Sequence, residues 1–466
     1  MKNDKRIKKN IGVTASERYL QKLAEESFLE LWSWPNLYKK KNKELCDLLV
    51  ICGEHIIIFS DKTISYPNTG NSNLDWSRWY KRAVFQSAKQ AKGAARWIKE
   101  NPERVFLDKD CRKNIPFDLS HKNFKIHIVC VALGAEEKCK AHFGGGSGSL
   151  VLVAGKEPNE EELFFVGDVF EDDFFVHVLN EANLDIVLRE LNTITDFTDY
   201  LVEKENFLRS GRVIVAEGEE ELLAWYLQGM KSRYKHGFIF PEKEGSKDYN
   251  TVIFGSGLYD ELKSSKEYAL KKEADEISIL WDSLIDTFTK HMLEGTTMVR
   301  PGEVFSIDKH KAGVETMALE PRIIRRLKSE GLWGMLQKSH EKDRTFRAVI
   351  PNAGEEGVGY VFMTLKVPQS KKISYAKYRR TRHMMLLAYV LGTLKMYPHI
   401  KKIVGIAFEP PSESSSEDMI YAEQPIWTKK LVRDLEKDCA EFNLLQDKNL
   451  TFGTHSVSEY PHPNNS

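Results

Sequence analysis

The sequence has few cysteines, no long apolar run and no excess of charge of either sign. Its six cysteines are scattered among 466 residues and form no Cys-x-x-Cys pair, which argues against a zinc ribbon. No stretch of about 18 apolar residues is present, so we expect no transmembrane helix. Lys and Arg together number 68, as do Asp and Glu, so overall charge argues neither for nor against a nucleic-acid partner.

What is present is the composition of a globular protein. Hydrophobic residues make up 41% of the chain and charged residues 29%, which is typical of a soluble protein with well-packed cores. The length suits two or three domains of ordinary size. Cysteines inside apolar runs, and a basic N-terminus without an apolar signal core, predict a reducing, cytoplasmic setting.

The most informative stretch is ELCDLLVICGEHIIIFSDKTI, residues 44–64. Two apolar runs flank a short break at Gly53-Glu54. Runs that are apolar on both faces are typical of central strands in a sheet that is covered by helices. The break fits a tight turn, so the stretch predicts a β-hairpin at the centre of a sheet.

Charged residues interrupt this hairpin at Asp47, Asp61 and Lys62. Burying an unpaired carboxylate costs several kcal/mol, roughly, so Asp47 needs a partner, and Lys62 on the neighbouring strand is a candidate. Two acids and a lysine at the end of a hairpin suit metal-assisted cleavage of a phosphodiester. The carboxylates would hold Mg²⁺ or Mn²⁺, and the lysine would orient a water molecule and neutralise the transition state.

The helices predicted on either side of the hairpin carry further candidates. Thr14 and Glu17 form a T-x-x-E capping box at the start of the first helix. Glu17 either serves only as that cap or also reaches a site at the end of the sheet. A second, basic helix is predicted from about Trp76 to Glu100, with polar residues that either face a phosphate backbone or are simply solvated: Arg78, Arg82, Gln86, Lys89 and Gln90.

The predicted order of elements is helix, strands, acid-bearing hairpin, basic helix and strand. In this order, the stretch from Thr14 to Leu133 resembles the PD-(D/E)XK, or restriction-endonuclease-like, nucleases. The resemblance covers about a quarter of the chain and implies a mixed sheet between helices that binds Mg²⁺. Asp47 matches the acid of the family's second strand, Lys62 matches its lysine, and Glu17 matches by position an acid that many members carry on the first helix.

One position departs from the family pattern. The second acid is expected two residues before the lysine, where this chain has Ser60, and the acid is next door at Asp61. On a regular strand Asp61 faces away from Ser60 and Lys62. Either a bulge brings Asp61 round, or Ser60 or a backbone carbonyl supplies the ligand, or the site is weakened or inactive.

The rest of the chain divides by pattern. We predict an α/β (α+β) protein with a nuclease-like domain at 1–160, a mostly helical region at 161–340 and a second α/β domain at 341–466. The last has Lys366 in the lysine's place but Thr364 two positions earlier, which predicts a degenerate relative without metal chemistry. A glycine-rich turn at 144–149 lacks the Gly-Lys-Ser/Thr ending and precedes a strand, so we interpret it as a hairpin loop instead of a phosphate loop.

These observations predict a cytoplasmic, Mg²⁺-dependent nuclease that is more an endonuclease than an exonuclease. DNA is expected ahead of RNA, because most relatives of this fold cut DNA. Analogy of fold alone suggests an anti-phage or mobile-element defence effector, acting as a homo-oligomer or with a partner protein of that system. Two alternatives remain open, an inactive nuclease fold that binds nucleic acid or protein, and a hydrolase or transferase that uses the glycine loop.

Overall fold

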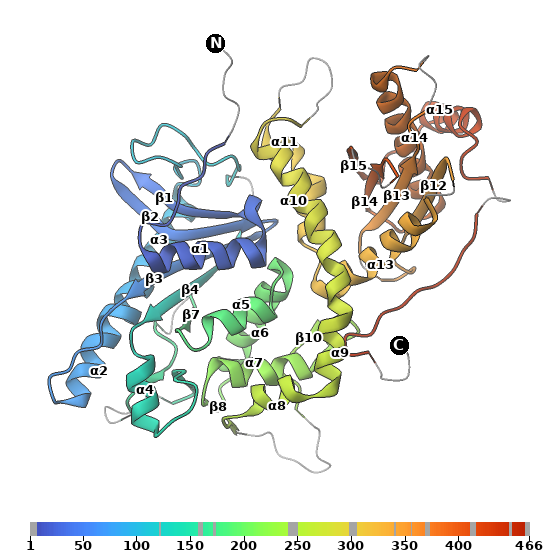
Figure 1. The fold of residues 1–466 in the computed structure, drawn as a ribbon. Coiled ribbons are helices and arrows are strands. Elements are labelled where there is room, and N and C mark those ends of the chain that lie inside the picture. The colour runs from blue at the N-terminus through green and yellow to red at the C-terminus, as the bar shows by residue number, and fades with distance from the viewer. Residues whose placement is uncertain are drawn as a thin grey trace.

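The structure is a computed structural model and confirms a mixed α/β chain (Figure 1). It describes the residue ranges 7–120, 123–156, 162–170, 174–240, 250–297, 305–339, 342–355, 357–368, 373–410, 416–446 and 450–461. Within these ranges, a five-stranded sheet lies in the N-terminal part, a four-stranded and a two-stranded sheet lie in the middle, and another four-stranded sheet lies in the C-terminal part. None of the described helices combines the length and the apolar character that crossing a bilayer requires.

The N-terminal sheet has the strand order β1-β2-β3-β4-β7. The first three strands form an antiparallel meander, and β4 and β7 then add in parallel. The predicted hairpin is confirmed, because Cys52 pairs with His55 across a turn in which Gly53 has a φ of 58°. The strands are β1 (Ser33–Lys40), β2 (Lys43–Cys52), β3 (His55–Thr63), β4 (Lys125–Leu133) and β7 (Val176–Leu179).

Helices cover both faces of this sheet, which is why its central strands are apolar on both sides. On one face lie α1 (Ala15–Phe28) and α6 (Ile194–Leu208), whose Phe28 and Phe197 pack against Phe59 of β3. On the other face a long helix packs on β3 and β4. It consists of α2 (Ser72–Tyr80), a π-helical turn (Lys81–Phe85) and α3 (Gln86–Glu100).

The middle of the chain adds a small sheet of order β11-β8-β5-β6 and a set of helices. Its strands are β5 (Val151–Ala154), β6 (Phe165–Val166), β8 (Val213–Ala216) and β11 (Thr251–Phe254), and β9 (Met230–Ser232) pairs separately with β10 (Lys235–His236). The shorter helices are α4 (Glu136–Phe143), α5 (Leu184–Glu190), α7 (Glu219–Gln228), α8 (Leu258–Ser264), α9 (Lys266–Asp275), α11 (Ile307–His310) and α12 (Ala312–Ala318). The longer ones are α10 (Ile279–Leu293) and α13 (Arg322–Ser339).

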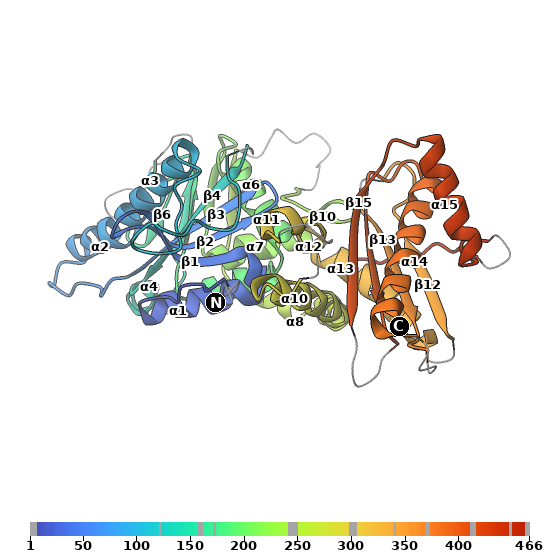
Figure 2. The same ribbon diagram turned by 90° about the horizontal axis from the view of Figure 1, so that it is seen from above.

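The C-terminal sheet stands apart from the first sheet, with α10 and α13 between them (Figure 2). Its order is β12-β13-β14-β15, formed by β12 (Arg344–Val349), β13 (Gly359–Leu365), β14 (Lys402–Phe408) and β15 (Glu417–Glu423). Two helices, α14 (Tyr375–Met396) and α15 (Lys429–Glu441), cover one face, and α13 packs against the other. After α15 the chain runs back to the middle region, so the last described residues lie near α9 (Figure 1).

Candidate active site at the end of the β2–β3 hairpin

The candidate site lies where β2 and β3 part. Their ladder runs from Cys52–His55 to Leu48–Phe59 and ends there, whereas β3 stays paired with β4 as far as Thr63. Beyond the last backbone-paired residues, a side-chain hydrogen bond joins the two strands. Asp47 Oδ2 accepts it from the Asp61 N–H at 2.7 Å. The carboxylate of Asp47 therefore closes the gap between the two strands.

The predicted partnership of Asp47 and Lys62 is confirmed. Lys62 Nζ lies 3.8 Å from Asp47 Oδ2, and the Ser60 hydroxyl donates to the same oxygen at 3.3 Å. The Asp47 side chain is only 6% exposed, whereas that of Lys62 is 31% exposed and borders solvent. A buried carboxylate thus meets a cation at the edge of the sheet.

The bulge considered for Ser60 and Asp61 does not occur. Strand β3 pairs with β4 residue for residue from His55–Lys125 to Thr63–Leu133, so alternation is preserved and Asp61 faces away from Lys62. Its Oδ2 accepts a hydrogen bond from Ser16 of α1, and its Oδ1 is buried and has no hydrogen-bond partner among the described residues. Asp61 therefore lies against α1, with one carboxylate oxygen left over.

Glu17 serves as the helix cap and also acts on the site electrostatically. Its Oε2 accepts the Val13 N–H at 2.7 Å, and Thr14 Oγ1 accepts the Glu17 N–H at 3.1 Å, which confirms the capping box. The negative charge of Glu17 is also close enough to raise the pKa of both Asp47 and Asp61. The cap is confirmed, and a direct contribution of Glu17 to the site stays a prediction.

Burial is the main cause of an unusual electrostatic state at the site. It raises the pKa of Asp47, against the opposing effects of Lys62 and of the hydrogen bond from Asp61. Burial also raises the pKa of Asp61, to about 6, although the Ser16 hydrogen bond opposes this, and the charges of Asp47 and Glu17 add to the increase. For both carboxylates, the ionised form is therefore less favourable in the folded chain than in water.

A fourth acid, Glu44, belongs to the same group and was missed from the sequence. The β1–β2 ladder pairs Leu37 with Cys46 but Tyr38 with Glu44, so Leu45 is an extra residue in β2. This bulge offsets the odd spacing of Glu44 and Asp47 and brings both to one face. Burial and the charges of Asp47 and Glu17 raise the pKa of Glu44. Glu44 joins the group because of a shift in strand register, and neither the composition nor the residue spacing of the sequence predicts that shift.

The residues present fit a divalent cation. Carboxylate oxygens are the ligands that Mg²⁺ prefers, and it often takes only one or two of them and fills its remaining positions with water. The unpartnered Oδ1 of Asp61 and the mutual repulsion of the four acids are features that a cation would relieve. Among the described residues, no three His, Cys, Asp or Glu side chains surround one ion position, so the structure does not bring a complete set of ligands together.

The predicted nucleic-acid-contacting residues lie on the long helix behind the site. Arg78, Arg82, Gln86 and Lys89 are exposed, and Gln90 is half-buried. The helix is tied to the site from its other side, because Ser87 of α3 donates a hydrogen bond to the carbonyl of Ser60 at 3.3 Å. The π-helical turn at Lys81–Phe85 interrupts this helix, a feature that often occurs near functional sites.

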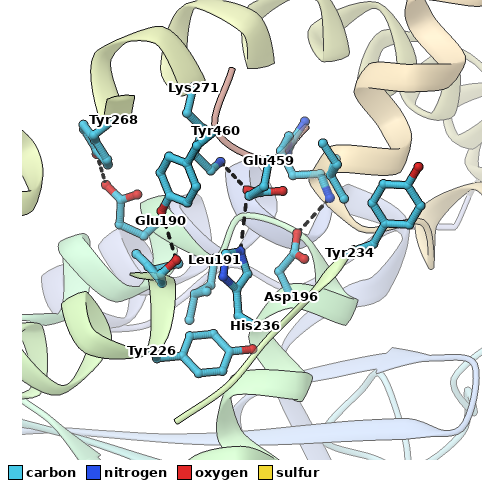
Figure 3. A pocket seen from close by; sticks show the side chains of 13 residues that line it. Glu190, Leu191, Asp196, Tyr226, Tyr234, His236, Tyr268, Lys271, Glu459 and Tyr460 are labelled. Atoms are coloured by element: carbon cyan, nitrogen blue, oxygen red, sulfur yellow. Dashed lines mark hydrogen bonds and ion pairs between the residues drawn. The ribbon is translucent and has the colours of Figure 1, made fainter. Parts of the chain in front are cut away.

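A cavity lies in the middle region and is filled by the chain itself (Figure 3). Glu459 enters it from the C-terminal segment and lies 3.0 Å from Lys271 and 3.5 Å from His236. Burial alone would raise the pKa of Glu459, but the hydrogen bond and charge of His236 and the charge of Lys271 lower it to about 2. The remaining volume of about 20 Å³ holds about one water molecule, so we assign this cavity to packing.

Comparison of the chain with protein-family models, with curated proteins and with solved structures found no match.

Proposed function

We propose that this chain is a divalent-metal-dependent phosphodiesterase that cleaves nucleic acid at the end of the β2–β3 hairpin, with DNA ahead of RNA as substrate. The observation that supports the proposal best is the imbalance of charge at this site. Glu17, Glu44, Asp47 and Asp61 act on one another electrostatically, and the cation that the structure pairs with one of them is Lys62. Such a group of acids favours binding of a further cation.

In the proposed reaction, the oxygen of a water molecule forms a bond to phosphorus, one P–O ester bond breaks, and a proton ends on the departing alkoxide. Mg²⁺ or Mn²⁺, held by Asp47 and Asp61, would supply Lewis-acid stabilisation of the charge that grows on the phosphate. Lys62 lies at the solvent-facing side of Asp47, where its ammonium group would orient the water and offset the same charge. Ser60 and the Asp61 N–H fix the carboxylate of Asp47 through hydrogen bonds.

An inactive nucleic-acid-binding module is the second candidate, and the direction of Asp61 favours it. In the family pattern, the second acid lies two residues before the lysine and shares its face. Here Asp61 faces the other way and contacts Ser16 of α1. If Asp61 does not reach an ion held by Asp47, the site would bind metal weakly and would not turn over.

The test is cleavage of supercoiled plasmid, linear duplex DNA and RNA with Mg²⁺ or Mn²⁺. We expect the wild-type chain to nick plasmid DNA, because the proposed enzyme is an endonuclease. Lys62→Ala should lower the rate by at least about a hundredfold, the size of effect seen when one transition-state donor is removed. Lys125→Ala is the matched control, since Lys125 is an exposed lysine at the opposite end of the β3–β4 pair. Absence of cleavage by the wild type, or equal rates for both variants, would refute the enzyme.

A further inference from the structure

The C-terminal sheet repeats the order of elements that builds the candidate active site. In the first domain, the antiparallel pair β2–β3 is followed by the helix α2–α3 and by β4, which pairs with β3 in parallel. In the last domain, the antiparallel pair β12–β13 is followed by α14 and by β14, which pairs with β13 in parallel. In both, a helix earlier in the chain packs on the face away from the crossover helix. It is α13 in the last domain and α1 in the first, where the extra strand β1 separates the helix from the pair.

The second copy lacks the acids of the first at the end of its hairpin. The rung next to the end of the β12–β13 ladder is Thr345–Thr364, and the two hydroxyl groups are hydrogen-bonded at 2.5 Å. Leu365 follows Thr364, where the first domain has Asp61 after Ser60. Leu365 thus stands where the first domain has the candidate ligand Asp61, so we look to binding, instead of metal chemistry, for a contribution of this domain.

The basic N-terminal half of α14 divides into an inward and an outward set. Arg382 is fully buried, and its Nε donates to Asp418 at 2.7 Å. Arg379 pairs with the other oxygen of the same carboxylate. These two arginines hold α14 onto β15 and are not available to a ligand.

The outward set is Lys377, Arg380 and His383, which we call the α14 basic face. All three side chains are exposed, and their spacing of three residues places them along one side of the helix. Among the described residues, no acid forms an ion pair with Lys377 or Arg380. The first turn of α14 contains no acidic residue, although cations near a helix N-terminus are unfavourable. Lys377 lies in that first turn, and an exposed cation there without an acidic partner indicates a requirement other than stability.

We propose that the C-terminal domain binds the phosphate backbone of nucleic acid through the α14 basic face, while the N-terminal domain cuts. The inference rests on the proposed function for its purpose, but its chemistry is independent of cleavage. Phosphate contacts from Lys and Arg supply most non-specific affinity for nucleic acid. The corresponding helix of the first domain also carries exposed cations, Arg78, Arg82 and Lys89. Exposed cations thus lie on the crossover helix of both copies.

The experiment measures binding of a fluorescent 30-base-pair duplex to the full-length chain by anisotropy, with EDTA present so that cleavage cannot interfere. The double variant Lys377→Glu/Arg380→Glu should raise the Kd at least about tenfold. It should also make the slope of log K against log salt shallower by about 2, close to one unit for each lost phosphate contact. The matched control is Lys401→Glu/Lys402→Glu, which reverses two exposed charges at the other end of the same domain.

Three outcomes of this experiment test binding through the α14 basic face independently of the proposed nuclease activity. Weaker binding by the α14 variant alone supports it, whether or not the wild-type chain cuts DNA. Equal affinities for the two double variants would overturn it even if the wild type is an active nuclease, and the α14 basic face would then serve another ligand, such as an acidic protein. Absence of binding by the wild type would overturn it as well.

Discussion

Two corners of this molecule are built by the same order of strands and helices but treat buried carboxylates in opposite ways. In the C-terminal domain, Glu409 and Asp418 face two arginines, and Arg382 alone lies 2.7 Å from Asp418 and 3.7 Å from Glu409. At the end of the β2–β3 hairpin, Glu17, Glu44, Asp47 and Asp61 lie around one ion-paired lysine, and the acid charges there raise the pKa of Glu44, Asp47 and Asp61. In the first arrangement, arginines of the protein balance the charges of both carboxylates, whereas the second has fewer positive than negative charges.

The difference teaches that the shared backbone does not decide the chemistry of either corner. A carboxylate matched by a guanidinium stabilises packing, because both charges are satisfied within the protein. A carboxylate held without a matching cation costs free energy, and such groups cluster at functional sites. The raised pKa of Asp61, at about 6, is the clearest sign of that cost here. Variants that remove the matched or the unmatched acids should therefore have opposite effects on stability.

The largest expected effect is loss of stability on breaking the matched corner. Asp418→Ala leaves the fully buried Arg382 without its shorter ion pair, and removing one partner of a buried pair costs about 3–5 kcal/mol. We expect chemical denaturation to show this loss in the transition of the C-terminal domain. A decrease below about 1 kcal/mol would mean that the corner is not held by this pair.

The opposite sign is expected at the unmatched corner. The folded chain binds the Asp61 proton more tightly than the unfolded chain does, so this group lowers stability as the pH rises from about 4 to the folded pKa of about 6. Without metal at pH 7.5, Asp61→Asn should raise the free energy of unfolding by at most about 3 kcal/mol. The gain should disappear near pH 4. A variant that is less stable than the wild type at both pH values would contradict the electrostatic account.

A smaller effect is expected from the hydroxyl groups that end the two hairpins. Ser60 donates to Asp47, and Thr364 is hydrogen-bonded to Thr345. Ser60→Ala and Thr364→Ala should each cost about 1 kcal/mol, the usual net value of one hydrogen bond. Only Ser60→Ala should also slow cleavage. Equal cleavage rates for the two variants would remove Ser60 from the candidate site.

The smallest effect concerns Glu44, the acid that the bulge at Leu45 brings to the site. Glu44→Gln removes one negative charge from an exposed position at the edge of the acid group, so the affinity for Mg²⁺ should fall only about threefold, in keeping with the modest energies of exposed charges. A titration of cleavage rate against Mg²⁺ concentration measures this change. An unchanged requirement for Mg²⁺ would show that Glu44 acts on the pKa of its neighbours without contributing to ion binding.

The sequence predicted the features that depend on local pattern. The two apolar runs around Gly53 gave the hairpin, the T-x-x-E spacing gave the cap at Glu17, and the cost of burying Asp47 pointed to Lys62. Each of these follows from the period of a strand or helix, or from the cost of an unpaired charge, and all three are confirmed.

Local sequence patterns did not predict the features that depend on strand register or on contacts between distant segments. The bulge expected as one option at Ser60 is absent, and a bulge occurs instead at Leu45, because the β1–β2 pairing shifts there. The contact of Asp61 with Ser16 joins two residues 45 positions apart. Likewise, Arg379, Arg380 and Arg382 lie close together in the sequence, and only the position of Asp418 on β15 shows that Arg382 points inward. Tertiary packing decides these points.

The central claim, that the acids around Asp47 form a site for a divalent cation, is tested most directly by calorimetric titration of the purified chain with Mg²⁺ and with Mn²⁺ at pH 7.5. We predict one site per chain in the wild type, and an affinity at least about tenfold weaker in Asp47→Asn, in which the central carboxylate has lost its charge. Thr345→Val, at the end of the other hairpin, should bind as the wild type does. Equal affinities for wild type and Asp47→Asn, or no binding by the wild type, would contradict the account.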